Sequence, residues 1–191
     1  MKVFDFDNTL YDGECSLDFF MYCVKKKKSL LRYLPKVAAK AVKYKTSRVE
    51  GREVSEFVEE MIKVFFDNCE NLDEHVRAFW KLNKRKLKKN MLAEISPRDA
   101  VISASPRFLL EGIADMLNTK NLICTELDME NKKLKYLCYS KNKVKSFHEH
   151  FGDTRIDEFY TDNMNDMPLM QLADRVFLVA GNKITELKKC E

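Results

Sequence analysis

The spacing of hydrophobic residues changes twice along the chain. Lys2–Phe6 is a short run of apolar and aromatic positions, which predicts a β-strand because the run is too short for a helix. From Ser16 to about Lys89, hydrophobic residues recur at helical spacing, which predicts several amphipathic helices in succession. After Ser96-Pro97 the short apolar runs return. The pattern therefore predicts a helical insertion within a chain that is otherwise built from strands and helices.

Strands and helices alternate over the second half of the sequence. Short apolar runs predict strands at Ala100–Ile102, Leu122–Thr125, Lys133–Leu137, Glu158–Thr161 and Val176–Val179. Helical spacing predicts helices at Phe108–Leu117, Val144–Phe151 and Leu169–Ala173. The polar turn Asp128–Lys132 joins two of the strands as a hairpin. Such alternation is typical of an α/β fold, and we expect a Rossmann-like, mostly parallel sheet covered on both faces.

Polar side chains follow three of the predicted strands at the point where each strand ends. Asp5 and Asp7 end the first strand, Ser103 follows the strand at Ala100–Ile102, and Asp162 follows the strand at Glu158–Thr161. Ligands of parallel α/β sheets bind beyond the carboxyl ends of the strands. The sequence therefore predicts a functional site at one edge of the sheet.

Asp5 and Asp7 are two residues apart, so both carboxylates can face a common site as the chain leaves the strand. One carboxylate can attack phosphorus, and the other can protonate the leaving oxygen and later deprotonate the attacking water. A phosphate dianion repels a carboxylate, so a hard cation such as Mg²⁺ is needed, with Asp162 as a second ligand. The alternative for an isolated pair of this kind is two turn or N-cap carboxylates.

Other phosphate- or metal-binding motifs are absent from the sequence. Leu10 stands where a calcium-binding EF-hand loop requires glycine, and neither a Walker-type phosphate loop nor a GxGxxG run occurs. Three histidines and six cysteines without a CxxC pair give little support to a zinc site. The scattered cysteines instead indicate reduced thiols in a cytoplasmic protein.

Charge is distributed unevenly, although the net charge is only +4. Residues 15–95 contain 19 Lys and Arg against 11 Asp and Glu, and the rest of the chain is acidic. These basic residues can be solvated helix faces, or they can attract an anionic substrate to a metal-binding core. We do not expect nucleic-acid binding, because no RNA-binding motif joins the basic residues.

Membrane insertion is not expected from the sequence. No run of roughly 18 uncharged apolar residues occurs, and Asp5 and Asp7 fall where the apolar part of a signal peptide would begin. The aromatic and apolar residues around Lys25–Lys28 leave contact with an anionic membrane surface as the weaker alternative to packing within the helical insertion. The oligomeric state does not follow from the sequence.

Four segments resemble, in order, the motifs of the haloacid dehalogenase-like superfamily, and of its phosphoserine-phosphatase-like branch in particular. Asp5-Phe6-Asp7-Asn8-Thr9-Leu10 resembles motif I, and Val101-Ile102-Ser103 resembles motif II. Lys143 resembles the motif III lysine and is favoured over its neighbours Lys141 and Lys145. Asp162-Asn163-Met164-Asn165-Asp166 resembles motif IV. The resemblance covers residues 1–14 and about 96–180.

The resemblance implies a role for each matching residue. Asp5 is the expected nucleophile and Mg²⁺ ligand, and Asp7 the expected general acid/base whose backbone carbonyl also binds the metal. Lys143 is the expected positive charge beside the phosphoryl group, and Asp162 a metal ligand. Three residues are expected to bind phosphoryl oxygens or line the site: Thr9, Ser103 and Asn165. Asp166 is expected to orient groups that contact metal or substrate.

The resemblance also implies the domain organisation and the activity. Residues 1–14 and 96–191 are expected to form the catalytic core, with 15–95 as a helical cap inserted after motif I. The expected activity is Mg²⁺-dependent hydrolysis of a phosphate monoester through an aspartyl-phosphate. Phosphoserine or another small phosphorylated metabolite is the expected substrate.

Two residues point weakly toward phosphoserine. Glu14 lies where phosphoserine phosphatases carry a glutamate that contacts the substrate amine, although a carboxylate at a helix start is an equally good interpretation. Arg52 can bind the carboxylate or can be a surface helix residue. Ser103-Ala104-Ser105-Pro106 departs from the Ser-Gly-Gly that usually follows in this branch. A lipid-phosphate phosphatase of the phosphatidylglycerophosphate type, a phosphotransferase and a non-catalytic phosphate- or metal-binding module are the alternatives.

Overall fold

The computed structural model describes residues 1–46, 51–68 and 71–187. In these residues a seven-stranded sheet has the order β4-β3-β2-β1-β5-β6-β7. The strands are β1 (Lys2–Phe4), β2 (Ala100–Pro106), β3 (Asn121–Asp128), β4 (Lys133–Tyr136), β5 (Ile156–Thr161), β6 (Ala173–Ala180) and β7 (Lys183–Leu187). The five inner strands are parallel and only the two outer pairs are antiparallel, which confirms the predicted α/β fold.

Strands predicted from the sequence are all present, with two differences. β2 does not end at Ser103 but continues to Pro106, with a register shift against β3 between Ile102 and Pro106. β7 was not predicted, because most of its side chains are exposed and it lacks a continuous apolar run. The hairpin of β3 and β4 is confirmed.

Because successive side chains of a strand point to opposite sides, the hydrophobic core is divided between the two faces of the sheet. One face presents Phe4, Val101, Leu122 and Tyr160, which pack with α6 (Arg107–Leu110) and the 3₁₀ helix η3 (Glu111–Met116). The other presents Val3, Ile102, Ile123 and Phe159, which pack with α7 (Lys141–Phe151) and α8 (Met167–Met170). Both faces of the parallel sheet are therefore covered, as parallel sheets require.

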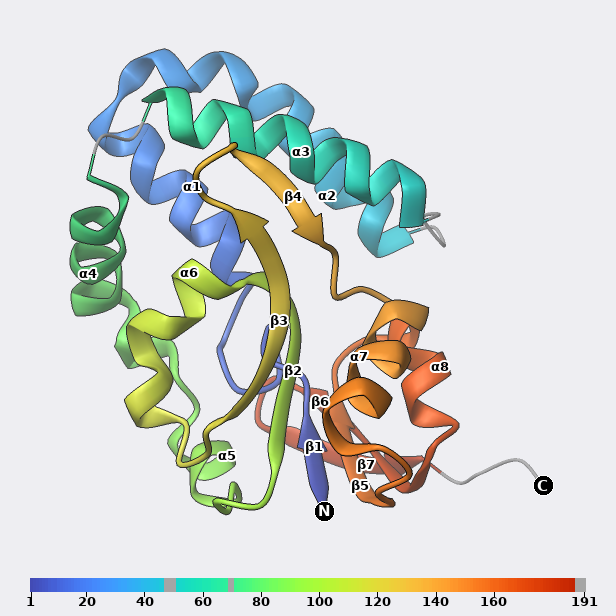
Figure 1. The fold of residues 1–191 in the computed structure, drawn as a ribbon. Helices are drawn as coiled ribbons and strands as arrows, with labels where there is room; N and C mark the ends of the chain where they lie inside the picture. The colour runs from blue at the N-terminus through green and yellow to red at the C-terminus, as the bar shows by residue number, and fades with distance from the viewer. Residues whose placement is uncertain (47–50, 69–70, 188–191) are drawn as a thin grey trace.

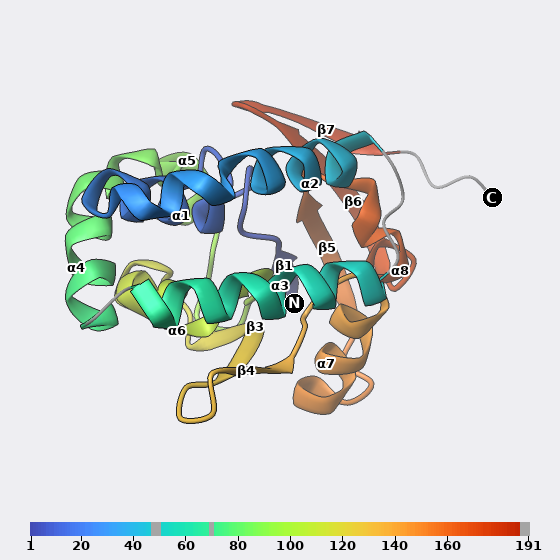
Figure 2. The same cartoon turned by 90° about the horizontal axis from the view of Figure 1, so that it is seen from above.

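The segment between β1 and β2 is helical, as the spacing predicts. It contains α1 (Cys15–Lys26), η1 (Lys28–Tyr33), α2 (Leu34–Thr46), α3 (Gly51–Asn68), α4 (Leu72–Asn83), η2 (Lys84–Lys86) and α5 (Lys89–Ala93). Figure 1 shows α1, α2 and α3 beyond the carboxyl ends of the strands. Seen from above, α1 and α2 form one row and α3 a second row beside it (Figure 2).

The helical segment and the sheet share one hydrophobic core. Phe19 of α1 and Phe79 of α4 belong to the same cluster of buried residues as Val101 of β2 and Leu109 of α6. Trp80 of α4 is 3% exposed, and its indole Nε1–H donates a hydrogen bond of 2.6 Å to the carbonyl oxygen of Leu109. The residues on both sides of the junction are therefore packed as one body.

The chain enters and leaves the helical segment at the same place. The Lys88 amide donates to the carbonyl oxygen of Leu10 at 2.8 Å, and the Asp12 amide donates to that of Lys86 at 2.9 Å. Tyr11 and Leu87 form an antiparallel bridge between these bonds. The two ends of the insertion are thus paired as in a short hairpin.

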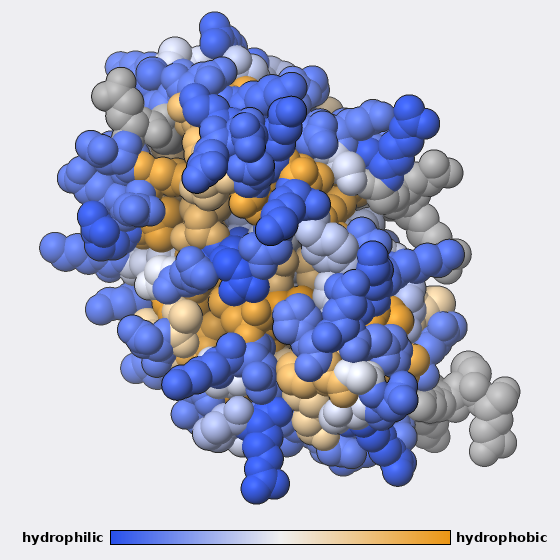
Figure 3. All heavy atoms as spheres, viewed as in Figure 1, coloured by the Kyte–Doolittle hydropathy of each residue, from blue (hydrophilic) through white to orange (hydrophobic). Residues whose placement is uncertain are grey.

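Hydrophilic residues cover much of the face seen in Figure 3, with hydrophobic surface between them. Within the described ranges, no helix combines the length and apolar character that a membrane span needs. Cys15, Cys23, Cys124 and Cys138 form no disulfide, whereas Cys69 and Cys190 lie outside the described residues.

Candidate active site

The carboxyl ends of β1 and β5 bring the predicted carboxylates together in one pocket. The Asp5 amide donates to the carbonyl oxygen of Tyr160 at 2.8 Å, which keeps the chain beside β5 for one residue beyond β1. Asp7 lies in the turn that follows, and Asp162 immediately follows β5. All three carboxylates line the same pocket. This convergence is the one expected at the carboxyl edge of a parallel sheet.

Lys143 forms ion pairs with two carboxylates, those of Asp5 and Asp166. Its ammonium nitrogen Nζ lies 2.7 Å from Oδ1 of Asp5 and 2.8 Å from Oδ2 of Asp166. All three side chains are buried, and the Thr161 hydroxyl donates a further bond of 2.9 Å to Asp166. Lys145 is instead exposed and paired with Glu149, and Lys141 is exposed as well. The geometry thus supports the choice of Lys143 over both neighbours.

Burial and charge shift the ionisation of this cluster. Burial raises the pKa of Asp5 well above its usual value, the Lys143 ammonium opposes the shift, and the nearby carboxylates of Asp166 and Asp162 add to it. Burial alone would lower the pKa of Lys143, but Asp166 and Asp5 outweigh it and raise that pKa well above its usual value. One ammonium therefore faces more than one carboxylate, which leaves the site short of positive charge.

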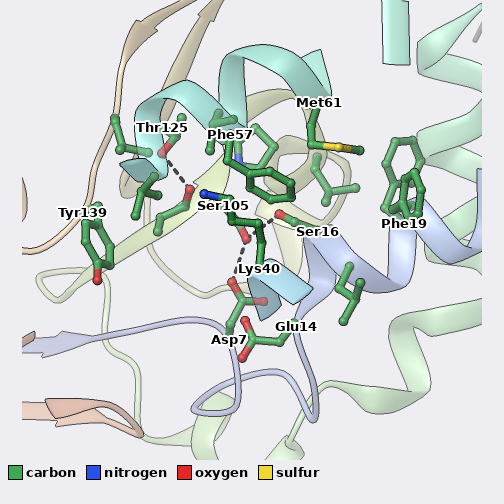
Figure 4. Close-up of a pocket in the computed structure, with 18 of the residues that line it drawn as sticks. Asp7, Glu14, Ser16, Phe19, Lys40, Phe57, Met61, Ser105, Thr125 and Tyr139 are labelled. Carbon is green, nitrogen blue, oxygen red and sulfur yellow. Dashed lines mark hydrogen bonds between the residues drawn. The ribbon is translucent and has the colours of Figure 1, made fainter. Parts of the chain in front are cut away.

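Asp7 is held by hydrogen bonds to both of its carboxylate oxygens. The backbone amide of Cys15 donates to Oδ1 at 2.6 Å, and the Ser105 hydroxyl donates to Oδ2 at 2.6 Å. The Ser105 hydroxyl oxygen also lies 2.9 Å from that of Ser16 (Figure 4). Burial raises the pKa of Asp7, while the bonds from Ser105 and Cys15 lower it. Asp7 is therefore oriented and shifted toward the protonated form that a general acid needs.

The turn after Asp7 is stabilised by its own side chains and by Lys88. Asn8 adopts a left-handed backbone conformation with φ of 56°, which asparagine tolerates better than most residues. Its side-chain amide donates to Glu14 at 2.7 Å. The Lys88 ammonium donates to the carbonyl oxygens of Asn8 and Gly181. These contacts hold the turn against the β6–β7 connection.

The donor set fits a magnesium ion. Asp5 and Asp162 supply carboxylate oxygens, and burial together with the charge of Asp166 raises the pKa of Asp162 to about 6. Among the described residues there is no group of three or more His, Cys, Asp or Glu side chains that could hold a metal. Mg²⁺ does not need one, since it keeps several waters and binds through one or two carboxylates and the substrate phosphate. A cation here would also offset the excess negative charge.

Of the other predicted site residues, some line the pocket and some do not. Asn165 and Glu14 line the pocket, whereas Thr9 and Ser103 are fully buried and do not. The Ser103 hydroxyl oxygen accepts a bond from the Ser105 amide, while Oγ1 of Thr9 has no hydrogen-bond partner in the described part of the chain. Arg52 is not at the pocket. Its side chain is 87% exposed and pairs with Glu56, so it is a surface helix residue.

Some residues of the site could not be inferred from motifs. Ser105 lies two positions after Ser103, within the run that departs from the expected glycines, and its hydroxyl was not expected to hold Asp7. Lys40 enters the pocket from α2 (Figure 4) and adds a cation that no motif contains. The only signal in the sequence was the general basic character of the insertion.

Comparison with known proteins identifies a family and a fold. Residues 3–171 match the model of a family described as haloacid dehalogenase-like hydrolase. No curated protein matches the chain. Among solved structures, a protein with unknown function from Bordetella pertussis is 16% identical, with a TM-score of 0.71, over 92% of this chain and 87% of that one.

Two further solved structures are similar in fold. A phosphoserine phosphohydrolase-like protein from Francisella tularensis is 17% identical, with a TM-score of 0.57, over 92% of this chain and 86% of that one. A HAD family hydrolase from Salmonella enterica serovar Typhi is 12% identical, with a TM-score of 0.53, over 90% of this chain and 59% of that one. At these identities the likeness concerns the fold.

Proposed function

Because the chain belongs to the haloacid dehalogenase-like hydrolases, we propose that it is a Mg²⁺-dependent phosphatase that hydrolyses a phosphate monoester through an aspartyl-phosphate on Asp5. The observation that supports this most directly is the pairing of a buried Asp5 with the Lys143 ammonium at 2.7 Å, beside a separately held Asp7. The Lys143 ammonium beside Asp5 supports a role for Asp5 as the attacking carboxylate. The separate hydrogen bonds to Asp7 support a role for Asp7 in proton transfer.

In the first step, a carboxylate oxygen of Asp5 forms a bond to phosphorus while the bond to the ester oxygen breaks. The protonated Asp7 gives its proton to that oxygen, so the product leaves as an alcohol. Lys143 donates to Oδ1 of Asp5 and keeps positive charge beside the transferring group. Such charge matters because phosphoryl transfer depends mainly on positioning and electrostatics.

In the second step, Asp7 takes a proton from a water molecule, whose oxygen attacks phosphorus and releases Asp5 and inorganic phosphate. Asp166 accepts a hydrogen bond from Lys143 and another from the Thr161 hydroxyl, so that Asp166 holds Lys143 in place throughout. Asp5, Asp162 and the backbone carbonyl of Asp7 would hold Mg²⁺, which supplies the positive charge that lets a carboxylate approach a phosphate dianion.

The proposal is tested with p-nitrophenyl phosphate, a generic aryl ester. The wild-type protein is expected to release p-nitrophenol with Mg²⁺, to lose this activity in EDTA and to regain it when Mg²⁺ is restored. Asp5→Asn is expected to abolish turnover, because an amide cannot act as the nucleophile. Asp115→Asn, the same substitution at an exposed position of η3, serves as the control. Wild-type rates in Asp5→Asn would show that the nucleophile is another group.

A further inference from the structure

The pocket that contains the candidate catalytic residues extends well beyond them. Its volume is about 470 Å³, which lies within the range of roughly 300–1,000 Å³ of small-molecule sites. Asp5, Asp7 and Lys143 line one part of it, and helices α1, α2 and α3 line much of the rest together with the β3–β4 hairpin. A phosphoryl group at Asp5 would therefore have its organic portion in the space under these helices.

The wall around that organic portion is mostly apolar. Phe19 of α1 and Phe57 and Met61 of α3 lie on the side of the pocket away from Asp7 (Figure 4). Leu127 of β3 and Leu137, which follows β4, contribute from the hairpin. Thus the helical segment and the hairpin together surround the site with hydrocarbon and aromatic surface.

Among the described residues that line this space, few charged side chains are available as partners for an amino-acid substrate. The ammonium and carboxylate of phosphoserine would each need a group of opposite charge when they leave water. The Glu14 carboxylate is already bonded to Asn8, and Arg52 is on the surface, where it pairs with Glu56. Lys40 and Glu53 also line the pocket, on α2 and α3. These charges are few beside the apolar wall.

Because the wall of this space is mostly apolar and few charged side chains line it, we infer that the substrate is a phosphate monoester whose alcohol portion is apolar, such as an alkyl, prenyl or aryl group. The inference rests on the proposed phosphatase function and names the substrate class of that site. Each methylene that moves from water into an apolar environment favours binding by about fourfold. The apolar wall would therefore select extended hydrocarbon groups over short or charged ones.

The test compares ethyl, butyl and hexyl phosphate with O-phosphoserine at concentrations where all are monomeric. We expect kcat/KM to rise along the alkyl series by roughly two-hundredfold from ethyl to hexyl, and to be low for phosphoserine. Binding of hexylphosphonate and ethylphosphonate, measured by calorimetry, gives a readout that does not depend on turnover. Hexylphosphonate is expected to bind more tightly by a similar factor.

A variant pair locates the effect in the pocket. Met61→Asp, which places a charge in the apolar wall, is expected to reduce kcat/KM for hexyl phosphate at least tenfold more than it reduces kcat/KM for ethyl phosphate. Met116→Asp makes the same change at a side chain that is 44% exposed on η3, and it is expected to leave both values unchanged. Equal losses with ethyl and hexyl phosphate in Met61→Asp would overturn the inference.

The outcomes also separate this inference from the proposed function. A flat alkyl series, or preference for phosphoserine, in an enzyme that hydrolyses p-nitrophenyl phosphate would overturn the substrate class alone. Absence of turnover on every ester, with hexylphosphonate still preferred, would overturn the phosphatase proposal alone. Phosphate release from hexyl phosphate would identify a free amphiphile as the source, and release only from phosphatidate vesicles would identify a membrane lipid. Either of these supports an apolar substrate.

Discussion

Asp7 shows how the behaviour of one residue is determined by its neighbours. A hydroxyl and a backbone amide bond its two oxygens, so that the carboxylate has one orientation. The same two bonds lower its pKa against the rise caused by burial. Ser105 therefore acts as a positioning residue. It lies in the stretch of β2 where the register against β3 shifts, between Ile102 and Pro106.

Replacing Ser105 by alanine tests this role. A hydrogen bond to a charged group contributes about 1.5–3 kcal/mol of stabilisation. Because Ser105 orients Asp7 for proton transfer, Ser105→Ala is expected to lower kcat about tenfold or more, with little change in KM. The hydrogen bond from Ser105 favours the ionised form of Asp7, so its loss is expected to raise the pKa of Asp7. Because the first step uses protonated Asp7, the alkaline limb of the pH profile of kcat/KM is expected to move to higher pH. Ser29→Ala, at an exposed position of η1, is the control. An unchanged pH profile would argue against a role in positioning Asp7.

Residues at the ends of strands were predictable, and residues that depend on packing were not. Asp5 and Asp162 follow apolar runs, and parallel strands bring such positions to one edge whatever the details of the fold. Lys143 could be placed only by its motif, and the structure brings it to Asp5. Lys40 depends on how α2 lies over the sheet, which helical spacing does not specify. The sequence left Arg52 open between a substrate contact and a surface helix residue for the same reason, because the side of α3 on which it lies could not be known.

At the level of elements, the contact between α4 and the α6–η3 segment is unusually close. A Cβ atom added at Gly112 would lie 2.6 Å from Cδ1 of Trp80 and 2.8 Å from Cγ1 of Val76. Both neighbours are buried, so neither can move away freely. Glycine is therefore needed at this position for the two helices to approach, and not for a special backbone conformation.

Gly112→Ala is expected to destabilise the protein. Overpacking of a filled core costs about 1–3 kcal/mol, which corresponds to a decrease in Tm of several degrees for a chain of this size. Thermal unfolding followed by circular dichroism provides the measurement. Trp80→Leu shortens the side chain in contact, so the cost of Gly112→Ala is expected to be smaller in that background. Additive losses in the double variant would show that Trp80 is not the source of the strain.

The predicted elements were most accurate where side chains are buried. β5 and β6 are inner strands, and their apolar runs could hardly be interpreted otherwise. β7 is an edge strand with exposed Lys183 and Glu186, so its pattern resembles a loop. The predicted helix at 108–117 begins as α6 and continues as the 3₁₀ helix η3, where the close contact at Gly112 falls.

At the level of the whole molecule, the most important feature is the core shared by the helical segment and the sheet. Phe19 and Phe79 pack in the same cluster as Phe4 and Leu109. Separating the two parts would expose this apolar surface to water. The helical segment is therefore not expected to unfold independently of the sheet.

This expectation can be tested with the single tryptophan of the chain, Trp80, at the junction. Urea unfolding measured by Trp80 fluorescence and by far-ultraviolet circular dichroism is expected to give coincident transitions, as for one cooperative unit. Fluorescence that changes at a lower urea concentration than circular dichroism would show that the junction opens first. Hydrogen exchange of α4 amides at the rate of global unfolding would be a second sign of a common transition.

The pairing of Leu10 with Lys88 and of Asp12 with Lys86 has a consequence for how such an enzyme can diversify. Because the insertion begins and ends at neighbouring points, helices of another length or sequence can replace it without displacing the turn that follows Asp5 and contains Asp7. A graft would have to supply apolar side chains for the shared core. Within that condition, new substrate ranges can be acquired while the reacting groups stay in place.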